Sequence, residues 1–111
     1  AQAPEWFTTA PVGAMKTLLD KTGLKASDID LFEVNEAFAV VAMAAMKEIG
    51  FERDKLNVHG GAVALGHPIG CSGARILTTL IHALHGKDAQ RGMASICIGG
   101  GEALAMVVER V

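Results

Sequence analysis

The chain has 111 residues, of which 50% are apolar and 20% are charged, and its net charge is -2 at pH 7. This length fits one domain or part of one, and no Ser-, Gln- or Pro-rich linker divides it. Because the sequence offers no basic surface of the kind that nucleic acid or an acidic membrane surface requires, we expect neither as a partner.

The first half of the sequence predicts a helix, a strand and a second helix. Pro11 suits the first turn of a helix, and apolar residues at helical spacing continue toward Gly23, which ends it. A strand is predicted over residues 28–34. Asn35 follows that strand and fits the N-cap of a second helix, which Gly50 closes.

The second half predicts a third helix and three strands. A short strand over residues 56–59 leads into a glycine-rich stretch over residues 60–73, and a helix follows from Ser72 to Gly86. Apolar strands are predicted over residues 93–98 and 103–108, joined by glycines as an antiparallel hairpin. The alternation of helices and strands indicates an α/β fold.

The second helix is apolar at every position from residue 37 to residue 46, so none of its faces suits water. It is too short to span a bilayer and continues directly into Lys47 and Glu48. A small domain seldom encloses a helix completely. We therefore expect a partner subunit, or the rest of a longer polypeptide, to cover it.

The glycine-rich stretch surrounds a single histidine, His67, and contains no acidic residue and no other base. Glycine permits sharp turns and close approach of the backbone, and Pro68 stiffens the chain just after the histidine. This composition predicts an imidazole held in a narrow cleft.

Asn35, His67 and Cys97 each fall at or after the end of a predicted strand, where clefts form in open α/β sheets. We therefore expect them to share one cleft. Structural roles remain open for all three: Asn35 as a helix cap, His67 as a residue that caps a turn, and Cys97 as a small buried core residue.

Two other kinds of site fit the sequence poorly. Gly66, Gly70 and Gly73 lack the spacing of a dinucleotide-binding loop, and no Lys-Ser or Lys-Thr pair follows as in a P-loop. His59, His67 and Cys71 match no familiar zinc pattern, so we expect no metal.

Three motifs are recognisable in order: Asn-Glu-Ala-Phe-Ala over residues 35–39, the glycine-rich stretch continued to Arg75, and Cys-Ile-Gly-Gly-Gly over residues 97–101. Together they closely resemble the C-terminal signatures of thiolases, the acetyl-CoA acetyltransferases and 3-ketoacyl-CoA thiolases. The resemblance implies that residues 1–111 are the C-terminal domain, one half of a layered αβαβα fold with a mixed sheet and helices on both faces. It also implies that helix 37–46 lies in the layer between two sheets, against the N-terminal half.

The resemblance assigns roles residue by residue. His67 matches the histidine that draws the proton from a nucleophilic cysteine and helps to hold the thioester oxygen, and Asn35 matches the asparagine that positions a water beside it. Cys97 matches the second cysteine, which takes a proton from the α-carbon of the acceptor acyl-CoA in synthesis and returns it in cleavage. The Gly99 N–H matches an oxyanion-hole donor, and Phe38 is expected to line the pocket.

The nucleophilic cysteine of the family has no counterpart here, because Cys71 occupies a loop position where small residues are usual. We therefore expect the chain alone to be inactive. The sequence also departs from the family at Glu102 and Ala103, where another glycine is usual after the triple glycine. This departure leaves the turn into the last strand to be settled by the structure.

The resemblance implies coenzyme A thioesters as substrates, no cofactor, and a homodimer or homotetramer when full length. Residues 1–6 carry neither a secretory nor a transit pattern, so we expect a cytoplasmic protein, with mitochondria and peroxisomes also compatible. The chain does not begin with Met, and we expect a piece of a longer protein. Two alternatives remain: a non-catalytic module that binds CoA or phosphate, and a structural thiolase-like partner.

Overall fold

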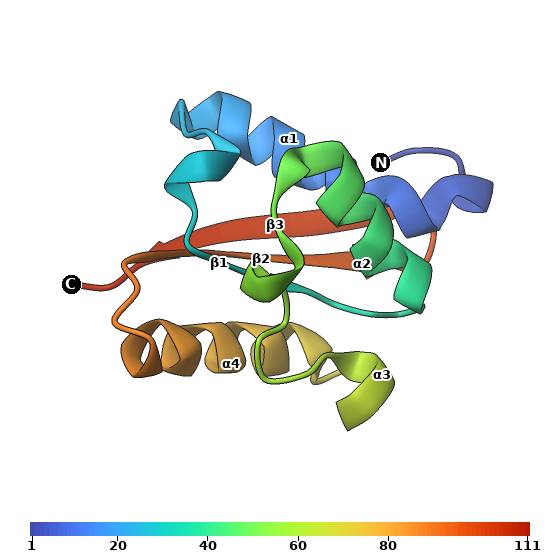
Figure 1. Ribbon diagram of the computed structural model, residues 1–111. Helices are drawn as coiled ribbons and strands as arrows, with labels where there is room; N and C mark the ends of the chain where they lie inside the picture. Colours follow the sequence, from blue (N-terminus) through green and yellow to red (C-terminus); the bar gives the residue numbers. More distant parts are fainter.

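The computed structural model describes residues 1–111, and its elements form three layers (Figure 1). A three-stranded sheet in the order β1-β2-β3 lies in the middle. Helices α1 and α2 cover one face, and α4 covers part of the other. The elements are η1 (Pro4–Thr9), α1 (Ala10–Thr22), η2 (Ala26–Asp28), β1 (Leu31–Val34), α2 (Ala39–Ala45), η3 (Met46–Gly50), η4 (Arg53–Lys55), α3 (Ala62–Leu65), α4 (Ser72–Gly86), β2 (Arg91–Ile98) and β3 (Glu102–Glu109).

The sheet is mixed, as predicted. β1 pairs with β2 in parallel, with Val34 opposite Ser95, and β3 returns antiparallel, with Cys97 opposite Ala103. The antiparallel hairpin expected at the end of the chain is therefore confirmed. Because β1 and β2 are parallel, their carboxyl ends lie at the same end of the sheet, together with the β2–β3 turn and α3 (Figure 1).

Alternation along the strands separates two apolar clusters. Phe32 points toward α1 and α2, where its ring stacks on Phe51 with centroids 3.8 Å apart. On the opposite face, Leu80 of α4 packs so closely on β2 that a Cβ at Gly92 would lie 2.7 Å from its Cδ1. Glycine at this position is what allows α4 to lie directly on the sheet.

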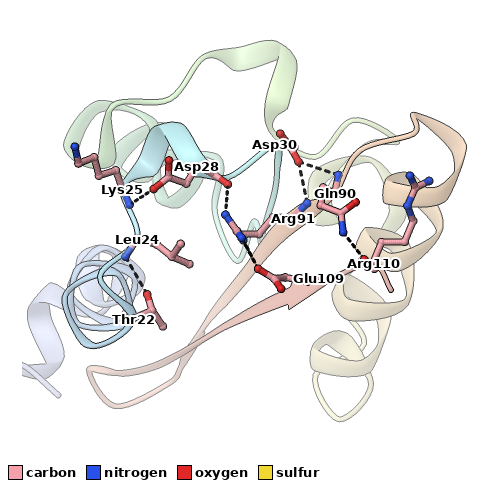
Figure 2. A network of polar contacts seen from close by, with 9 residues as sticks. All are labelled: Thr22, Leu24, Lys25, Asp28, Asp30, Gln90, Arg91, Glu109 and Arg110. Atoms are coloured by element: carbon pink, nitrogen blue, oxygen red, sulfur yellow. Dashed lines mark hydrogen bonds and ion pairs between the residues drawn. The ribbon is translucent and has the colours of Figure 1, made fainter.

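A polar network ties the strands together at the end of the sheet opposite to Asn35 and Cys97 (Figure 2). The Asp30 carboxylate accepts hydrogen bonds from the backbone N–H groups of Gln90 and Arg91, at 2.9 and 2.8 Å. Arg91 also pairs with Glu109 and donates to the carbonyl oxygen of Asp28. These contacts connect the start of β1 to the start of β2 and the end of β3.

Several predicted elements differ from the structure. The strand predicted over residues 28–34 begins only at Leu31, because residues 26–28 form a 3₁₀ turn. The strand predicted over residues 56–59 is reduced to one bridge between Leu56 and Phe32. The prediction of Asn35 as the N-cap of α2 is wrong, because the helix begins only at Ala39 and its N-cap is Phe38.

The apolar helix is only partly enclosed within this chain. Val41, Ala42 and Ala45 of α2 are buried, whereas Val40 and Met43 are exposed. Leu104 and Met106 of β3 are also exposed and line an open apolar groove beside α4. No helix is long and apolar enough to cross a membrane.

Candidate active site

The fold brings Asn35 and His67 into contact. Asn35 directly follows β1 and is 0% exposed, and its backbone N–H donates to the Ser95 carbonyl at 2.9 Å. His67 lies in the exposed loop between α3 and α4, just after Gly66, whose φ of 93° favours glycine. The Asn35 Nδ2 atom lies 3.4 Å from His67 Nε2. Two residues 32 positions apart in sequence thus meet at one end of the sheet.

Ser72 contacts the imidazole nitrogen that faces away from Asn35. Its Oγ lies 3.1 Å from the carbonyl oxygen of Pro68 and 2.5 Å from His67 Nδ1. When the hydroxyl proton points to the Pro68 carbonyl, Oγ accepts the hydrogen of Nδ1. In that tautomer of neutral His67 the lone pair is on Nε2, the nitrogen that faces Asn35 Nδ2, which can only donate. This tautomer suits a histidine that accepts a proton at Nε2.

The glycine loop is attached to β1 through Asn57 and Glu36. The Asn57 side chain pairs with both backbone groups of Val34: Oδ1 accepts from its N–H and Nδ2 donates to its carbonyl, both at 2.9 Å. Asn57 Nδ2 also donates to Glu36 Oε1 at 3.1 Å. Glu36 Oε2 accepts from the Val63 N–H at 3.0 Å. A side-chain network replaces the strand that the sequence predicted here.

Cys97 lies near the carboxyl end of β2, on the strand next to β1. Its side chain is 9% exposed, and burial raises the pKa of the thiol above its ordinary value. The thiol is free, like that of exposed Cys71. No hydrogen bond joins Cys97 to Asn35 or His67, so parallel strand ends alone bring it to their end of the sheet.

The turn after Cys97 uses its glycines in different ways. Gly99 has a φ of 60°, and Gly101 has a φ of 98° with its would-be Cβ only 2.1 Å from the backbone oxygen of Gln2. The Gly100 N–H donates to the Glu102 carboxylate at 3.1 Å. Glu102, which departs from the family pattern, therefore forms part of the turn and is the first residue of β3.

Phe38 lies at the start of α2 and is 59% exposed. Its ring meets Phe7 of η1 edge to face, with centroids 6.0 Å apart. In this chain it forms part of an open apolar surface rather than the wall of an enclosed pocket.

A buried ion pair lies on the α4 side of β1. Glu33 is 1% exposed, and its Oε2 lies 3.1 Å from Nη1 of Arg75 on α4. Burial raises the pKa of the Glu33 carboxyl to about 7, although the Arg75 charge opposes the shift. Oε1 of Glu33 and both Nε and Nη2 of Arg75 have no hydrogen-bond partner within the chain. Burial without full pairing explains why the neutral carboxyl is favoured.

No group of three or more His, Cys, Asp or Glu side chains converges on a point that could hold a metal ion. His59, His67 and Cys71, considered together in the sequence, are all exposed. The sequence-based interpretation missed the roles of Ser72, Glu36 and Asn57. The sequence position of two of them could have indicated a role near the site, since Ser72 begins the helix after His67 and Glu36 is adjacent to Asn35.

Comparison with known proteins gives the site its context. The family model described as "Thiolase, C-terminal domain" matches residues 1–110. Acetyl-CoA acetyltransferase 1 of Arabidopsis thaliana is 56% identical over 109 residues, which cover 98% of this chain and 26% of that protein. The Escherichia coli acetyl-CoA acetyltransferase is 53% identical over 97% of this chain and 27% of its own length. A 3-ketoacyl-CoA thiolase of Salmonella typhimurium is 56% identical over 97% of this chain and 29% of its own length.

Solved structures of thiolases also resemble this chain. The Acat5 thiolase of Ascaris suum, solved in complex with coenzyme A, superposes with a TM-score of 0.93 at 48% identity, covering 99% of this chain and 28% of that one. The acetyl-CoA acetyltransferase of Bacillus anthracis gives a TM-score of 0.95 at 43% identity with the same coverage. The chain thus spans between 26% and 29% of the length of these relatives. With its fold, its three motifs and its match over residues 1–110, the chain belongs to the thiolase family, as a C-terminal domain.

Proposed function

We propose that this chain supplies the proton-transfer half of a thiolase active site, which moves acyl groups between an enzyme cysteine and coenzyme A and forms or cleaves 3-ketoacyl-CoA. The observation that carries the proposal is the contact series from Ser72 through His67 to Asn35. It presents an unprotonated Nε2 beside a buried amide, as a general base requires. Relatives named as acetyl-CoA acetyltransferases and 3-ketoacyl-CoA thiolases support the reaction class.

In the first half-reaction, His67 Nε2 takes the proton of a nucleophilic cysteine thiol, and the thiolate attacks the thioester carbonyl. The developing negative oxygen is held by the new Nε2–H and by the water that Asn35 orients. As the tetrahedral intermediate collapses, the C–S bond to coenzyme A breaks and His67 returns its proton to the departing thiolate. The acyl group is then bound to the enzyme cysteine, and the Gly99 N–H donates to its carbonyl oxygen.

In the half-reaction that makes or breaks the carbon–carbon bond, Cys97 donates or accepts the proton of the α-carbon. In cleavage the C2–C3 bond breaks, the shortened acyl group stays on the enzyme cysteine, and the Cys97 thiol protonates the enolate of acetyl-CoA that leaves. In condensation the Cys97 thiolate removes a proton from the α-carbon of acetyl-CoA, and the resulting enolate attacks the acyl-enzyme. The burial that raises the pKa of Cys97 keeps it as a thiol at neutral pH, which suits the donor role in cleavage. Condensation requires that Cys97 first lose its proton.

The complete protein we propose contains an N-terminal half that carries the nucleophilic cysteine, acts on coenzyme A thioesters and assembles as a homodimer or homotetramer in the cytoplasm. The coenzyme A complex of the Ascaris suum relative supports the ligand class. Apolar side chains remain exposed on both faces of the chain, at Val40, Met43, Leu104 and Met106. This exposed apolar surface supports the proposal that a further domain or subunit covers them.

The test is thiolysis of acetoacetyl-CoA, followed by the loss of 3-ketoacyl absorbance. The chain is assayed alone, mixed with a separately expressed N-terminal half, and as a chimera in which it replaces the matching segment of the E. coli acetyl-CoA acetyltransferase. We expect activity in the chimera or the mixture, and none in the chain alone. Activity of the chain alone would place the nucleophile among its own cysteines.

Variants of the chimera then test the roles of individual residues. His67→Ala and Cys97→Ala should each reduce turnover to a small residual rate, whereas Cys71→Ser, which changes the exposed thiol of the loop, should leave it intact. Full activity of His67→Ala would contradict the proposal. A silent chimera that still binds coenzyme A would favour a binding module, and one that neither binds nor turns over would favour a structural partner.

A further inference from the structure

We propose that Glu36 is a positioning residue that fixes the His67 loop relative to Asn35, and that it acts on turnover through His67 alone. The inference rests on the proposed function of His67 and extends it to a neighbouring carboxylate. Its basis is the arrangement of contacts around the two carboxylate oxygens of Glu36.

Both oxygens of Glu36 are occupied by donors from the loop region. Oε2 accepts from the backbone N–H of Val63 at 3.0 Å, in the first turn of α3. That N–H has no partner within such a short helix, so the carboxylate supplies the missing acceptor. Only Ala64, Leu65 and Gly66 separate Val63 from His67. The carboxylate therefore holds the segment that delivers the histidine.

The other oxygen of Glu36 is hydrogen-bonded to Asn57, a side chain that is attached to β1. Oε1 accepts from Asn57 Nδ2 at 3.1 Å, and Asn57 is itself attached to Val34 by two side-chain hydrogen bonds of 2.9 Å. The Asn57 backbone N–H also donates to the carbonyl of Phe32 at 2.8 Å. Glu36 thus links the glycine loop to β1, the strand that Asn35 directly follows.

Close packing indicates that this link is tight. A Cβ at Gly61 would lie 2.4 Å from both Cδ and Oε2 of Glu36, and 2.7 Å from Asn57 Nδ2. The loop backbone is therefore in direct contact with the carboxylate, and a side chain on Gly61 would push the two apart.

Glu36 follows Asn35 directly in the chain, just after β1. Asn35 contacts the imidazole itself, while Glu36 holds the loop before it. Each oxygen of Glu36 accepts a hydrogen bond from this chain, and no hydrogen bond joins Glu36 to His67. Its role is to position His67, not to react.

The experiment uses the chimera with the E. coli relative and measures kcat and KM separately. Glu36→Ala removes both acceptors and should lower kcat by about 100-fold, the loss expected from about 1 Å of misplacement, with KM unchanged. Glu36→Gln keeps an acceptor for Val63 but presents an amide donor to Asn57, so its loss should be smaller. The matched control is Glu48→Gln, since Glu48 is 51% exposed and pairs only with exposed Lys16. This control should retain full activity.

A double-mutant cycle separates positioning from general damage. In a His67→Ala background, Glu36→Ala should leave the residual rate unchanged, because its effect passes through the histidine. A further drop in that background, or equal activity of Glu36→Gln, Glu36→Ala and the control, would overturn the inference. If Glu36→Ala does not fold, Glu36→Gln in the same cycle decides. Full activity of His67→Ala would instead refute the proposed function itself.

Discussion

Alanine at Gly61 tests how the glycine loop is held, because this substitution alters packing without straining the backbone. Gly61 has φ of -108° and ψ of -167°, an extended conformation that alanine adopts readily. The added Cβ would lie 2.4 Å from the Glu36 carboxylate and 2.7 Å from Asn57 Nδ2. Any effect of Gly61→Ala therefore comes from displacement of the network.

The magnitude follows from that geometry. The carboxylate must withdraw by about 1 Å to restore ordinary contact, and its hydrogen bonds of 3.0 and 3.1 Å to Val63 and Asn57 are then lost. Hydrogen bonds to charged groups contribute about 1.5–3 kcal/mol each, and overpacking costs about 1–3 kcal/mol. Allowing for partial relaxation, we expect a loss of about 3 kcal/mol in stability. A loop displaced by about 1 Å should also lower kcat by about 100-fold.

The assay is thiolysis by the chimera together with its thermal unfolding. Gly13→Ala provides the matched control, because a Cβ at Gly13 of α1 meets no atom within 4 Å. The decisive comparison is the double variant Gly61→Ala with Glu36→Ala, in which the clashing carboxylate is absent. Its loss should be well below the product of the two single losses, because only the close contact with Asn57 Nδ2 remains. Independent, multiplicative losses in the double variant would refute the reasoning.

Three further predictions concern stability. The raised pKa of Glu33, about 7 against 4.5, gives a stabilisation that is complete below pH 4.5 and lost as pH rises through about 7. Glu33→Gln should therefore flatten the dependence of melting temperature on pH in this window, and an unchanged slope would contradict the assignment. The backbone N–H of Arg91 lowers the pKa of Asp30, so this group stabilises the fold above pH 3.8 and loses that contribution as pH falls through its lowered pKa. Asp30→Asn should cost about 1 kcal/mol at neutral pH in urea unfolding, with little difference from wild type in strong acid. Leu80→Ala, at a fully buried position between α4 and β2, should cost about 2–5 kcal/mol in the same assay, and a loss near zero would show that α4 is not held by this contact.

Where local signals were strong, the sequence predicted the elements well. Pro11 lies in the first turn of α1 and Gly23 ends it in the left-handed conformation, because these two residues have few other conformations to adopt. The α4 helix and the final hairpin also lie where their periodicity placed them. The strand predicted over residues 56–59 is wrong because Asn57, with φ of 46°, pairs with β1 through its side chain instead of its backbone ladder.

The candidate site was predictable in part. The surrounding glycines drew attention to His67, whose catalytic role stays a prediction. The parallel pairing of β1 and β2 explains why Asn35 and Cys97 lie at the same end of the sheet. Asn35 was open to two interpretations, and the start of α2 at Ala39, with Phe38 as its N-cap, excludes the helix cap. Nothing in spacing alone indicates that Glu36 reaches Val63 or that Ser72 Oγ meets His67 Nδ1.

The sequence by itself determined the class of fold and the family, because these depend on periodicity and on side-chain types at fixed spacing. The residues that transfer protons stay a prediction. The tertiary structure decided which groups meet. The contact of His67 with Asn35, the attachment of its loop through Glu36 and Asn57, and the raised pKa of Glu33 all depend on segments that are distant in sequence. Hydrogen bonding and desolvation act over a few ångströms in space, and linear order does not specify those distances.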